Sequence, residues 1–403
     1  MKQKKIVFWS TMFLLIFAIN TVVNIGQQMV NTLVPKYAAS LSSAASAVGI
    51  VGGMFSFSAL LLRPFTSPAF DSFSKKRMLQ IALLVLCATM LLYASADSIP
   101  VILFARAMHG MSYGCIGTLC LAFAGDSLPT ESLGSGIGIF ALAQAVAQAI
   151  GPSIGLWVQR MAGYSGAFLA GLFMMVIAFV MTCFLREINP EELRPPYRLR
   201  WNNIIAREAV KPSVILFFMA LAQASIVSFL VIYGELRGIA DVGLYFTAHA
   251  ICLFISRPIA GKLSDKFGFE KVIIPGILCS ICAFWVISCA DRVEYLILAG
   301  MLAAFGFGAT QPAIQAMSMK RVPQQKRGAG ANTNYIFTDL GAIGGSYLVG
   351  AVIDLLRSTD YSLVEAYSAA FRVMTIPMVI AVIYAIFAFG VLPTKRGEGH
   401  AAD

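Results

Sequence analysis

Residues 256–271 read SRPIAGKLSDKFGFEK, and residues 62–77 read LRPFTSPAFDSFSKKR. When the two stretches are aligned, Arg63 matches Arg257 and Asp71 matches Asp265. Each stretch joins two long apolar runs through a short basic loop. A joint repeated in this way predicts that the second half of the chain is a diverged copy of the first.

The composition of the 403-residue chain determines its broad class. Hydrophobic residues make up 58% of it and charged residues only 12%, whereas soluble domains carry roughly 25% charged residues. Apolar runs long enough to cross a bilayer, roughly 20 residues each, recur along the whole chain. We therefore predict an all-α polytopic membrane protein with twelve spans, near residues 6–34, 44–65, 76–95, 99–124, 132–158, 163–185, 213–233, 241–262, 270–290, 294–318, 329–355 and 365–392.

The spans divide into two sets of six. We expect residues 1–185 to form an N-terminal six-helix bundle and residues 213–403 a C-terminal bundle with a short tail. Residues 186–212, rich in charge and proline, are predicted to be a cytoplasmic linker. The repeated loops share an orientation and each half has an even number of spans, so the bundles should be related by a pseudo-twofold axis normal to the membrane.

The net charge of +10 is unevenly distributed. Most Lys and Arg residues fall on one predicted side of the membrane, together with the N-terminus, both repeated loops and the linker. This bias predicts that both termini are cytoplasmic. The excess of positive charge is therefore explained by the orientation of the protein in the membrane, and no nucleic-acid partner is needed to explain it.

Patterns typical of enzymes and cofactor sites are absent from the sequence. There is no nucleotide-binding Gly-rich loop ending in Lys-Ser or Lys-Thr, and no Ser-His-Asp or metal-ligand spacing. Cys279 and Cys282 lie within an apolar run without further Cys or His nearby, which favours packing over metal binding. We expect no catalytic residues, no metal and no cofactor.

One acidic residue stands apart from the other nineteen. Asp339 lies well inside a predicted span, roughly ten residues or ~15 Å from its start, whereas the others fall in loops or at span ends. A carboxyl group there could bind and release protons as its surroundings alternate between wet and dry. Alternatively, Asp339 is structural and bonds a neighbouring helix. His109 and His249 are the other titratable groups inside spans.

Uncharged polar residues suggest a binding surface for an organic compound. Asn20, Asn24 and Gln27 form one stripe along the first predicted helix. Residues of similar chemistry in other spans are Gln223, Gln311, Gln315 and Tyr335. Such residues line a cavity for an amphipathic substrate, or they bond helices to one another; both readings stay open.

The stretch Arg257-Pro258-x-x-Gly261-x-Leu263-x-Asp265-x-Phe267-Gly268 resembles the signature loop of the major facilitator superfamily. The first copy departs from the family pattern, because Ser67 and Ser74 replace its two glycines. The resemblance spans essentially the whole chain. It implies a secondary transporter that works by alternating access.

The resemblance also implies a set of gating residues at the cytoplasmic ends of the helices. An aspartate there meets positive partners or a helix N-terminus, and glycine allows close helix approach. The implied gating residues are Asp71, Arg77, Asp126, Arg257, Gly261, Asp265 and Gly268. The alternative is that these loops carry only topological charge and packing.

Two further motifs resemble family features. Arg106 and His109 belong to a segment similar to the fourth-helix motif, and an arginine inside a membrane is functional by default. Arg106 could bind an anionic group of the substrate or keep a nearby carboxyl ionised. Gly151, Pro152 and Gly155 resemble the fifth-helix antiporter motif, which favours export.

These observations predict proton-coupled export of a small amphipathic organic compound, with Asp339, Arg106 and His109 in proton coupling. We expect a monomer in the cytoplasmic membrane of a bacterium, with a small-molecule substrate, protons and lipid as its partners. The main alternative is proton-coupled uptake of an organic anion that binds Arg106. A receptor or scaffold that transports nothing is the alternative of a different class.

Overall fold

The computed structural model describes residues 10–128, 133–187, 197, 205–323 and 327–389. All regular structure in these residues is helical. The helices are α1 (Thr11–Leu41), α2 (Ala45–Ser72), α3 (Lys75–Ser95), α4 (Ile99–Asp126), α5 (Leu133–Cys183), α6 (Arg207–Leu236), α7 (Gly243–Phe267), α8 (Glu270–Cys289), α9 (Val293–Arg321), α10 (Arg327–Arg357), α11 (Leu363–Val373) and α12 (Thr375–Phe389).

Local chemistry explains where several helices begin and end. The side chain of Ser10 accepts a hydrogen bond from the backbone of Phe13 at 3.1 Å and caps α1. Ser74 caps α3 in the same way. Helix α7 ends at Phe267 and is followed by Gly268, whose φ of +94° is a backbone conformation that glycine adopts readily.

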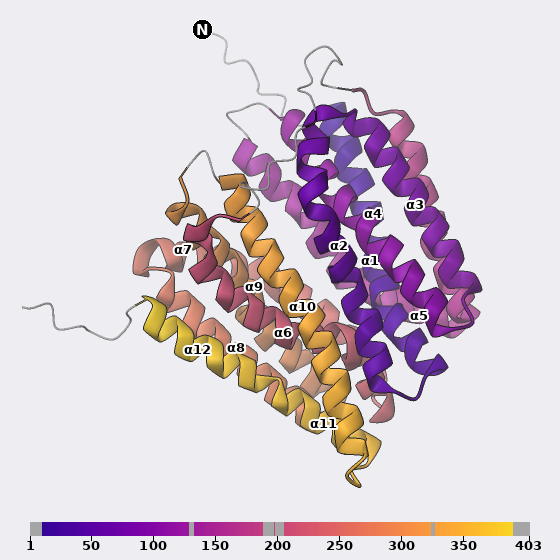
Figure 1. Ribbon diagram of the computed structural model, residues 1–403, viewed down its shortest axis with the longest axis vertical. Coiled ribbons are helices and arrows are strands. Elements are labelled where there is room, and N and C mark those ends of the chain that lie inside the picture. Colours follow the sequence, from indigo (N-terminus) through magenta and orange to yellow (C-terminus); the bar gives the residue numbers. More distant parts are fainter. Residues whose placement is uncertain (1–9, 129–132, 188–196, 198–204, 324–326, 390–403) are drawn as a thin grey trace, which may run out of the picture.

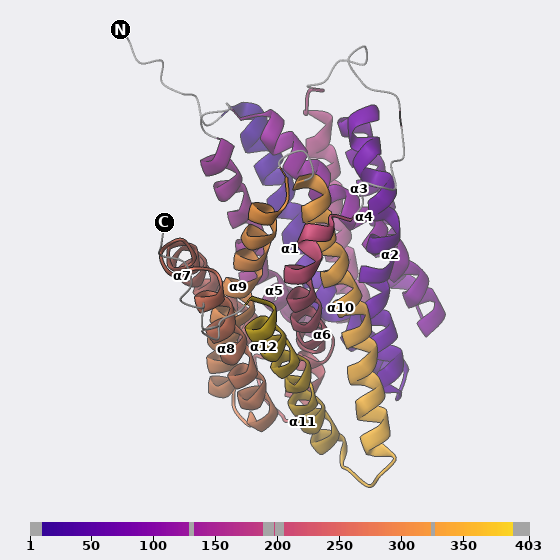
Figure 2. The same cartoon turned by 60° about the vertical axis from the view of Figure 1, so that its left-hand side comes forward.

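The helices form two groups (Figures 1 and 2). Helices α1–α5, drawn in indigo to magenta, pack against one another, and α6–α12, in rose to yellow, form the second group. The groups meet where α2 runs along α10 and where α5 runs along α7. We call the end of the molecule with the α2–α3 and α7–α8 connections the loop end, and the end with the α1–α2 and α10–α11 connections the far end.

The number of candidate spans differs from the prediction. Eleven helices among the described residues are long and apolar enough to cross a membrane, against the twelve expected. The difference arises at α5, which continues through Gly163, although that residue has non-helical angles of φ 70° and ψ −176°. The two predicted spans 132–158 and 163–185 thus fall in one helix with a break. Helix α6 begins at Arg207, within the segment predicted as a linker.

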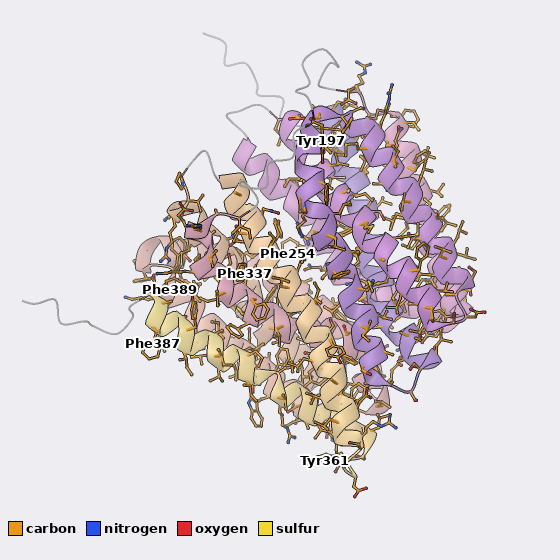
Figure 3. The ribbon with its side chains drawn as sticks, viewed as in Figure 1. Tyr197, Phe254, Phe337, Tyr361, Phe387 and Phe389 are labelled. Atoms are coloured by element: carbon orange, nitrogen blue, oxygen red, sulfur yellow. The ribbon has the colours of Figure 1, made fainter. Side chains whose placement is uncertain are left out.

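The outside of the helices is strongly apolar. Phe387 of α12, labelled in Figure 3, is 75% exposed, and Phe173 of α5 is 67% exposed. Water would solvate such side chains poorly, so this surface suits a lipid environment. The polar groups that could act on a substrate must therefore lie between helices.

Glycine brings α2 and α10 into close contact near the far end. A Cβ on Gly49 would overlap the carbonyl group of Ser346, and one on Gly350 would overlap that of Ala45. The two helix backbones can approach this closely only because these positions carry no side chain. The interface between the two groups is therefore tight at this end.

Candidate functional site

A cavity of about 270 Å³ lies between the two groups of helices. Helices α1 and α5 supply its wall on one side and α6, α7 and α9 on the other. The lining residues are Gln28, Asn31, Thr32, Gln148, Pro152, Gln223, Ile226, Val227, Tyr245, Phe246, His249, Leu253, Arg257, Phe307, Gly308 and Gln311. The cavity thus combines amide side chains and one arginine with apolar and aromatic surface, as organic ligands require.

Only some of the residues predicted to bind substrate line this cavity. Gln223 and Gln311 line the cavity, as do Pro152 and Arg257. Gln315 and Tyr335 are not among the lining residues.

The stripe on α1 faces its own group of helices. Asn24 accepts a hydrogen bond from the Tyr113 hydroxyl at 2.8 Å and donates to Asn20 Oδ1 at 3.0 Å. Gln27 Oε1 bonds His109 Nε2 on α4. These bonds tie α1 to α4, so the polar stripe joins helices, and the neighbouring face of α1 with Gln28, Asn31 and Thr32 meets the cavity.

Arg106 is buried on α4, with 1% of its surface exposed. Its Nη2 donates to Asn31 Oδ1 at 2.6 Å, and its guanidinium carbon lies 4.8 Å from the centre of the Phe55 ring. Its Nε and Nη1 atoms have no hydrogen-bond partner among the described residues, and no described carboxylate pairs with it. Arg106 therefore reaches the cavity only through Asn31.

An ion pair joins the two groups of helices across the α2–α10 interface. Arg63 Nε lies 2.7 Å from Asp339 Oδ2, and the side chains are 24% and 13% exposed. The guanidinium carbon of Arg63 also lies 4.7 Å from the centre of the Tyr335 ring. The one acid predicted inside a span thus has its cation on the other group of helices. Because little water reaches the pair, neutralising Asp339 would leave Arg63 without its counterion at a cost in free energy.

More polar contacts join the groups at the far end. Lys36 on α1 pairs with Glu235 on α6 at 2.6 Å, and Arg160 pairs with Asp241 at 3.1 Å. Asp354 of α10 accepts hydrogen bonds from the backbone of Ala45 and Ser46, both at 2.8 Å, at the N-terminus of α2. The far end is therefore closed by contacts between the groups.

Lys75 and Lys76 make contacts near the loop end that lie within the first group. Lys75 of α3 pairs with Asp126 at the end of α4 at 2.6 Å. Lys76 donates to the carbonyl groups of Cys183 and Leu185 at 2.9 and 2.7 Å. Asp126 thus has a positive partner, as the resemblance implied, but the partner belongs to its own group.

The other predicted gating residues make no hydrogen bond or ion pair between the two groups among the described residues. Arg77 is exposed, and a Cβ on Gly261 would have no atom within 4 Å, so Gly261 does not mediate close packing in this conformation. Gly268 follows the end of α7, as described above. The side chains of Asp71 and Asp265 lie outside the described residues.

The predicted packing glycines on α5 contact α1 closely. A Cβ on Gly155 would lie 2.8 Å from the Met29 carbonyl oxygen, and one on Gly151 would lie 2.7 Å from Gln28 Cβ. Both glycines therefore set the distance between α1 and α5 beside the cavity.

We expect Gly155→Ala to lower the thermal unfolding temperature, because the added methyl group costs about 1–3 kcal/mol in a packed interface. Gly117→Ala is the matched control, since a Cβ there meets no atom within 4 Å and alanine favours the helix. Thermal unfolding of both purified variants measures the difference. If Gly155→Ala and Gly117→Ala unfolded at the same temperature, α1 and α5 would be able to move apart without a loss of stability.

The model of the Major Facilitator Superfamily matches residues 16–240 and 213–402, and so almost the whole chain. The chain belongs to this superfamily. The present major facilitator is similar to the multidrug resistance protein MdtG of Salmonella arizonae, with 26% identity over 310 residues, 74% of this chain and 76% of MdtG. It is also similar to the multidrug resistance efflux pump PmrA of Streptococcus pneumoniae, with 24% identity over 314 residues, 75% of this chain and 78% of PmrA.

Solved structures of low identity share the fold of this major facilitator. The nucleoside transporter NupG matches with a TM-score of 0.76 and 13% identity, over 95% of this chain and 100% of NupG. A bacterial homologue of the lysosomal transporter Spinster, solved in an inward-facing and occupied conformation, matches with a TM-score of 0.73 and 14% identity, over 96% and 98% of the two chains. The chain is thus a multi-pass membrane transporter rather than an enzyme, which confirms those two predictions.

Sequence reasoning missed two residues of the major facilitator, Arg63, which pairs with Asp339, and Asn31, which lines the cavity. Arg63 was assigned to the cytoplasmic end of its span, although the helix continues to Ser72. Pro64 and Pro68 follow Arg63 closely, so the sequence carries no clear signal that places it inside the helix. Asn31 follows Gln27 by one helical turn, so extending the polar pattern of α1 could have found it.

Proposed function

We propose that this major facilitator couples proton entry to the export of a small amphipathic organic compound by alternating access. The observation that carries the proposal is the ion pair between Arg63 and Asp339 across the α2–α10 interface. Export is supported by the similarity to two multidrug efflux proteins and by the packing of Gly151 and Gly155 in the antiporter-like segment of α5.

The proposed coupling depends on the charge of Asp339. When its carboxylate is ionised, it attracts Arg63 and holds α2 against α10. When a proton binds, the carboxyl is neutral and the attraction to Arg63 is lost, so the interface is free to rearrange. Proton binding from outside and proton release inside would then drive the two groups of helices through the transport cycle.

The proposed topology places the loop end in the cytoplasm, together with both termini. The break at Gly163 would let α5 cross the membrane twice, because its 41-residue candidate span (Ala143–Cys183) extends over ~60 Å, about twice the hydrocarbon thickness. This arrangement gives twelve spans in two six-helix bundles related by a pseudo-twofold axis. With the far end closed outside, the described conformation corresponds to an inward-facing state.

Flux in proteoliposomes tests the proposal. Vesicles with an acidic lumen should take up an external cargo from a panel of fluorescent amphipathic cations and anions against its concentration gradient. Uptake driven instead by an acidic exterior would favour the alternative of symport. Absence of flux for every compound, with protein shown to be inserted, would favour a receptor or scaffold.

The far-end contacts make a second prediction about this cycle. We expect Glu235→Gln to increase outward opening by up to about fivefold, because it removes the Lys36–Glu235 pair and such partly exposed pairs contribute at most ~1 kcal/mol. The measurement is the rate at which a membrane-impermeant maleimide, added at the far end, labels a single cysteine introduced at Gln28 in the cavity. The eight native cysteines are replaced beforehand.

Glu294→Gln serves as the control, because Glu294 lies in the first turn of α9 at the same end and pairs with no described residue. Equal labelling rates in Glu235→Gln and the unsubstituted background would mean that the ion pair does not hold the far end closed.

A further inference from the structure

Arg257 lies on α7 and lines the cavity between the two groups of helices. It makes no hydrogen bond or ion pair with any described residue, and its Nε atom is buried without a partner. A guanidinium group carries five N–H donors in a planar fork. A buried guanidinium N–H without an acceptor is costly in a membrane protein, so an acceptor on a bound cargo would be its natural counterpart.

The repeated stretches make the lack of a partner informative. Arg63, which matches Arg257 in the sequence repeat, meets Asp339 on α10. Arg257 lies on the helix that packs along α5, and α5 contains no acidic residue anywhere between Leu133 and Cys183. The first arginine therefore has a counterion built into the protein, and the second faces a helix that supplies none.

The remaining lining of the cavity also favours a negative group. Arg257 is the only Lys, Arg, Asp or Glu among the residues that line it. Asn31 presents its Oδ1 atom to Arg106, which leaves its amide N–H groups without a described acceptor. Gln148 and Gln311 supply further amide donors. A cation in this cavity would meet the charge of Arg257 and no carboxylate.

We propose that the cargo is a small organic anion, whose carboxylate, sulfonate or phosphonate group binds Arg257 while its apolar part lies against Phe246, Leu253 and Phe307. The proposal rests on the proposed transport function and specifies the substrate class of the same cavity. It assigns anion binding to Arg257, whereas the sequence had suggested Arg106, which is buried and does not itself line the cavity; its hydrogen bond to Asn31 links it to the lining.

A set of probes of nearly equal shape and different charge tests the assignment. 2-Naphthoate, naphthalene-2-sulfonate and naphthalene-2-phosphonate are the anions, 2-naphthamide is the neutral probe, and 2-naphthamidine is the cation. Binding is measured by calorimetry on purified wild-type protein in detergent, without a proton gradient. We expect at least one anion to bind about tenfold or more tightly than the amide, with the cation weakest.

Substitutions then assign this preference to Arg257. In Arg257→Gln, the anion should lose about tenfold or more in affinity and the amide less than about threefold. Arg257→Lys, which keeps the charge, should retain part of the preference. Arg292→Gln is the matched control, because Arg292 is an exposed residue before α9 outside the cavity. Circular dichroism and thermal unfolding establish that each variant is folded.

Two outcomes would overturn the proposal. One is that no anion binds wild-type protein more tightly than the amide. The other is that Arg257→Gln keeps the anion preference. Because these measurements need no gradient, they are independent of proton coupling: anion binding without gradient-driven flux would contradict the proposed function and leave the anion site in place.

Discussion

Asp339→Asn is expected to abolish gradient-driven accumulation of cargo while leaving exchange of cargo across the membrane within about twofold of wild type. Asparagine cannot bind or release a proton at this position, but its Oδ1 atom can still accept a hydrogen bond from Arg63, whose Nε lies 2.7 Å from the carboxylate in the wild type. Like the protonated carboxyl, the neutral asparagine would hold Arg63 less strongly than the carboxylate does, so the interface could still rearrange but would no longer depend on protons. Proteoliposomes with an acidic lumen measure accumulation, and preloaded vesicles without a gradient measure exchange.

Asp291→Asn is the matched control for this variant, because Asp291 is an exposed residue between α8 and α9. The double variant Arg63→Gln, Asp339→Asn should be no worse in accumulation than either single variant, since all three remove the same interaction. If Asp339→Asn accumulates cargo like wild type, Asp339 is structural. Coupling must then be sought at His109, or the transporter is uncoupled.

Arg106→Gln is expected to raise the thermal unfolding temperature and to lower transport about tenfold or more. Two of the guanidinium nitrogens are buried without described partners, and each unsatisfied buried donor costs ~1–3 kcal/mol. Removing the charge relieves that cost. It also removes the donor that holds Asn31 at 2.6 Å, so a residue that lines the cavity loses its fixed orientation.

Thermal unfolding and cargo exchange, measured on the same preparations, separate function from structure at this position. Arg106→Lys keeps the charge without the planar fork of donors. Its unfolding temperature and its rate of cargo exchange should lie between those of wild type and Arg106→Gln. A lower unfolding temperature together with normal exchange in Arg106→Gln would identify Arg106 as a structural residue that stabilises the α1–α4 contact.

The features that could be predicted from the sequence are those that depend on residues close together along the chain. Apolar run length was enough to locate the helices, and the placement of Asp339 inside a helix agrees with its position in α10. The partner of Asp339 could not be predicted, because Arg63 is 276 residues away and the contact depends on how α2 and α10 are placed relative to each other. Run length also placed a division between residues 158 and 163, where Gly163 breaks the helical geometry of α5.

The polar stripe on α1 illustrates the same limit. Spacing identifies which residues share a helix face, but not what that face meets. Asn24 and Gln27 face Tyr113 and His109 of α4, whereas Asn31 reaches the cavity. A search for polar partners in the fourth span would have favoured helix bonding for the stripe, since that span carries both the tyrosine and the histidine.

The ion pairs at the far end connect transport to the salt content of the surroundings. Arg160 and Asp241 are 54% and 64% exposed, so dissolved ions can reach them, and screening acts over about 10 Å at 0.1 M salt. With the far end outside the cell, as proposed, a saline medium weakens the contacts that keep the outer side shut, and a dilute medium strengthens them. The pair between Arg63 and Asp339, with side chains 24% and 13% exposed, is less open to this influence. External salinity would therefore adjust how often the transporter opens outward more strongly than it alters the response to protons.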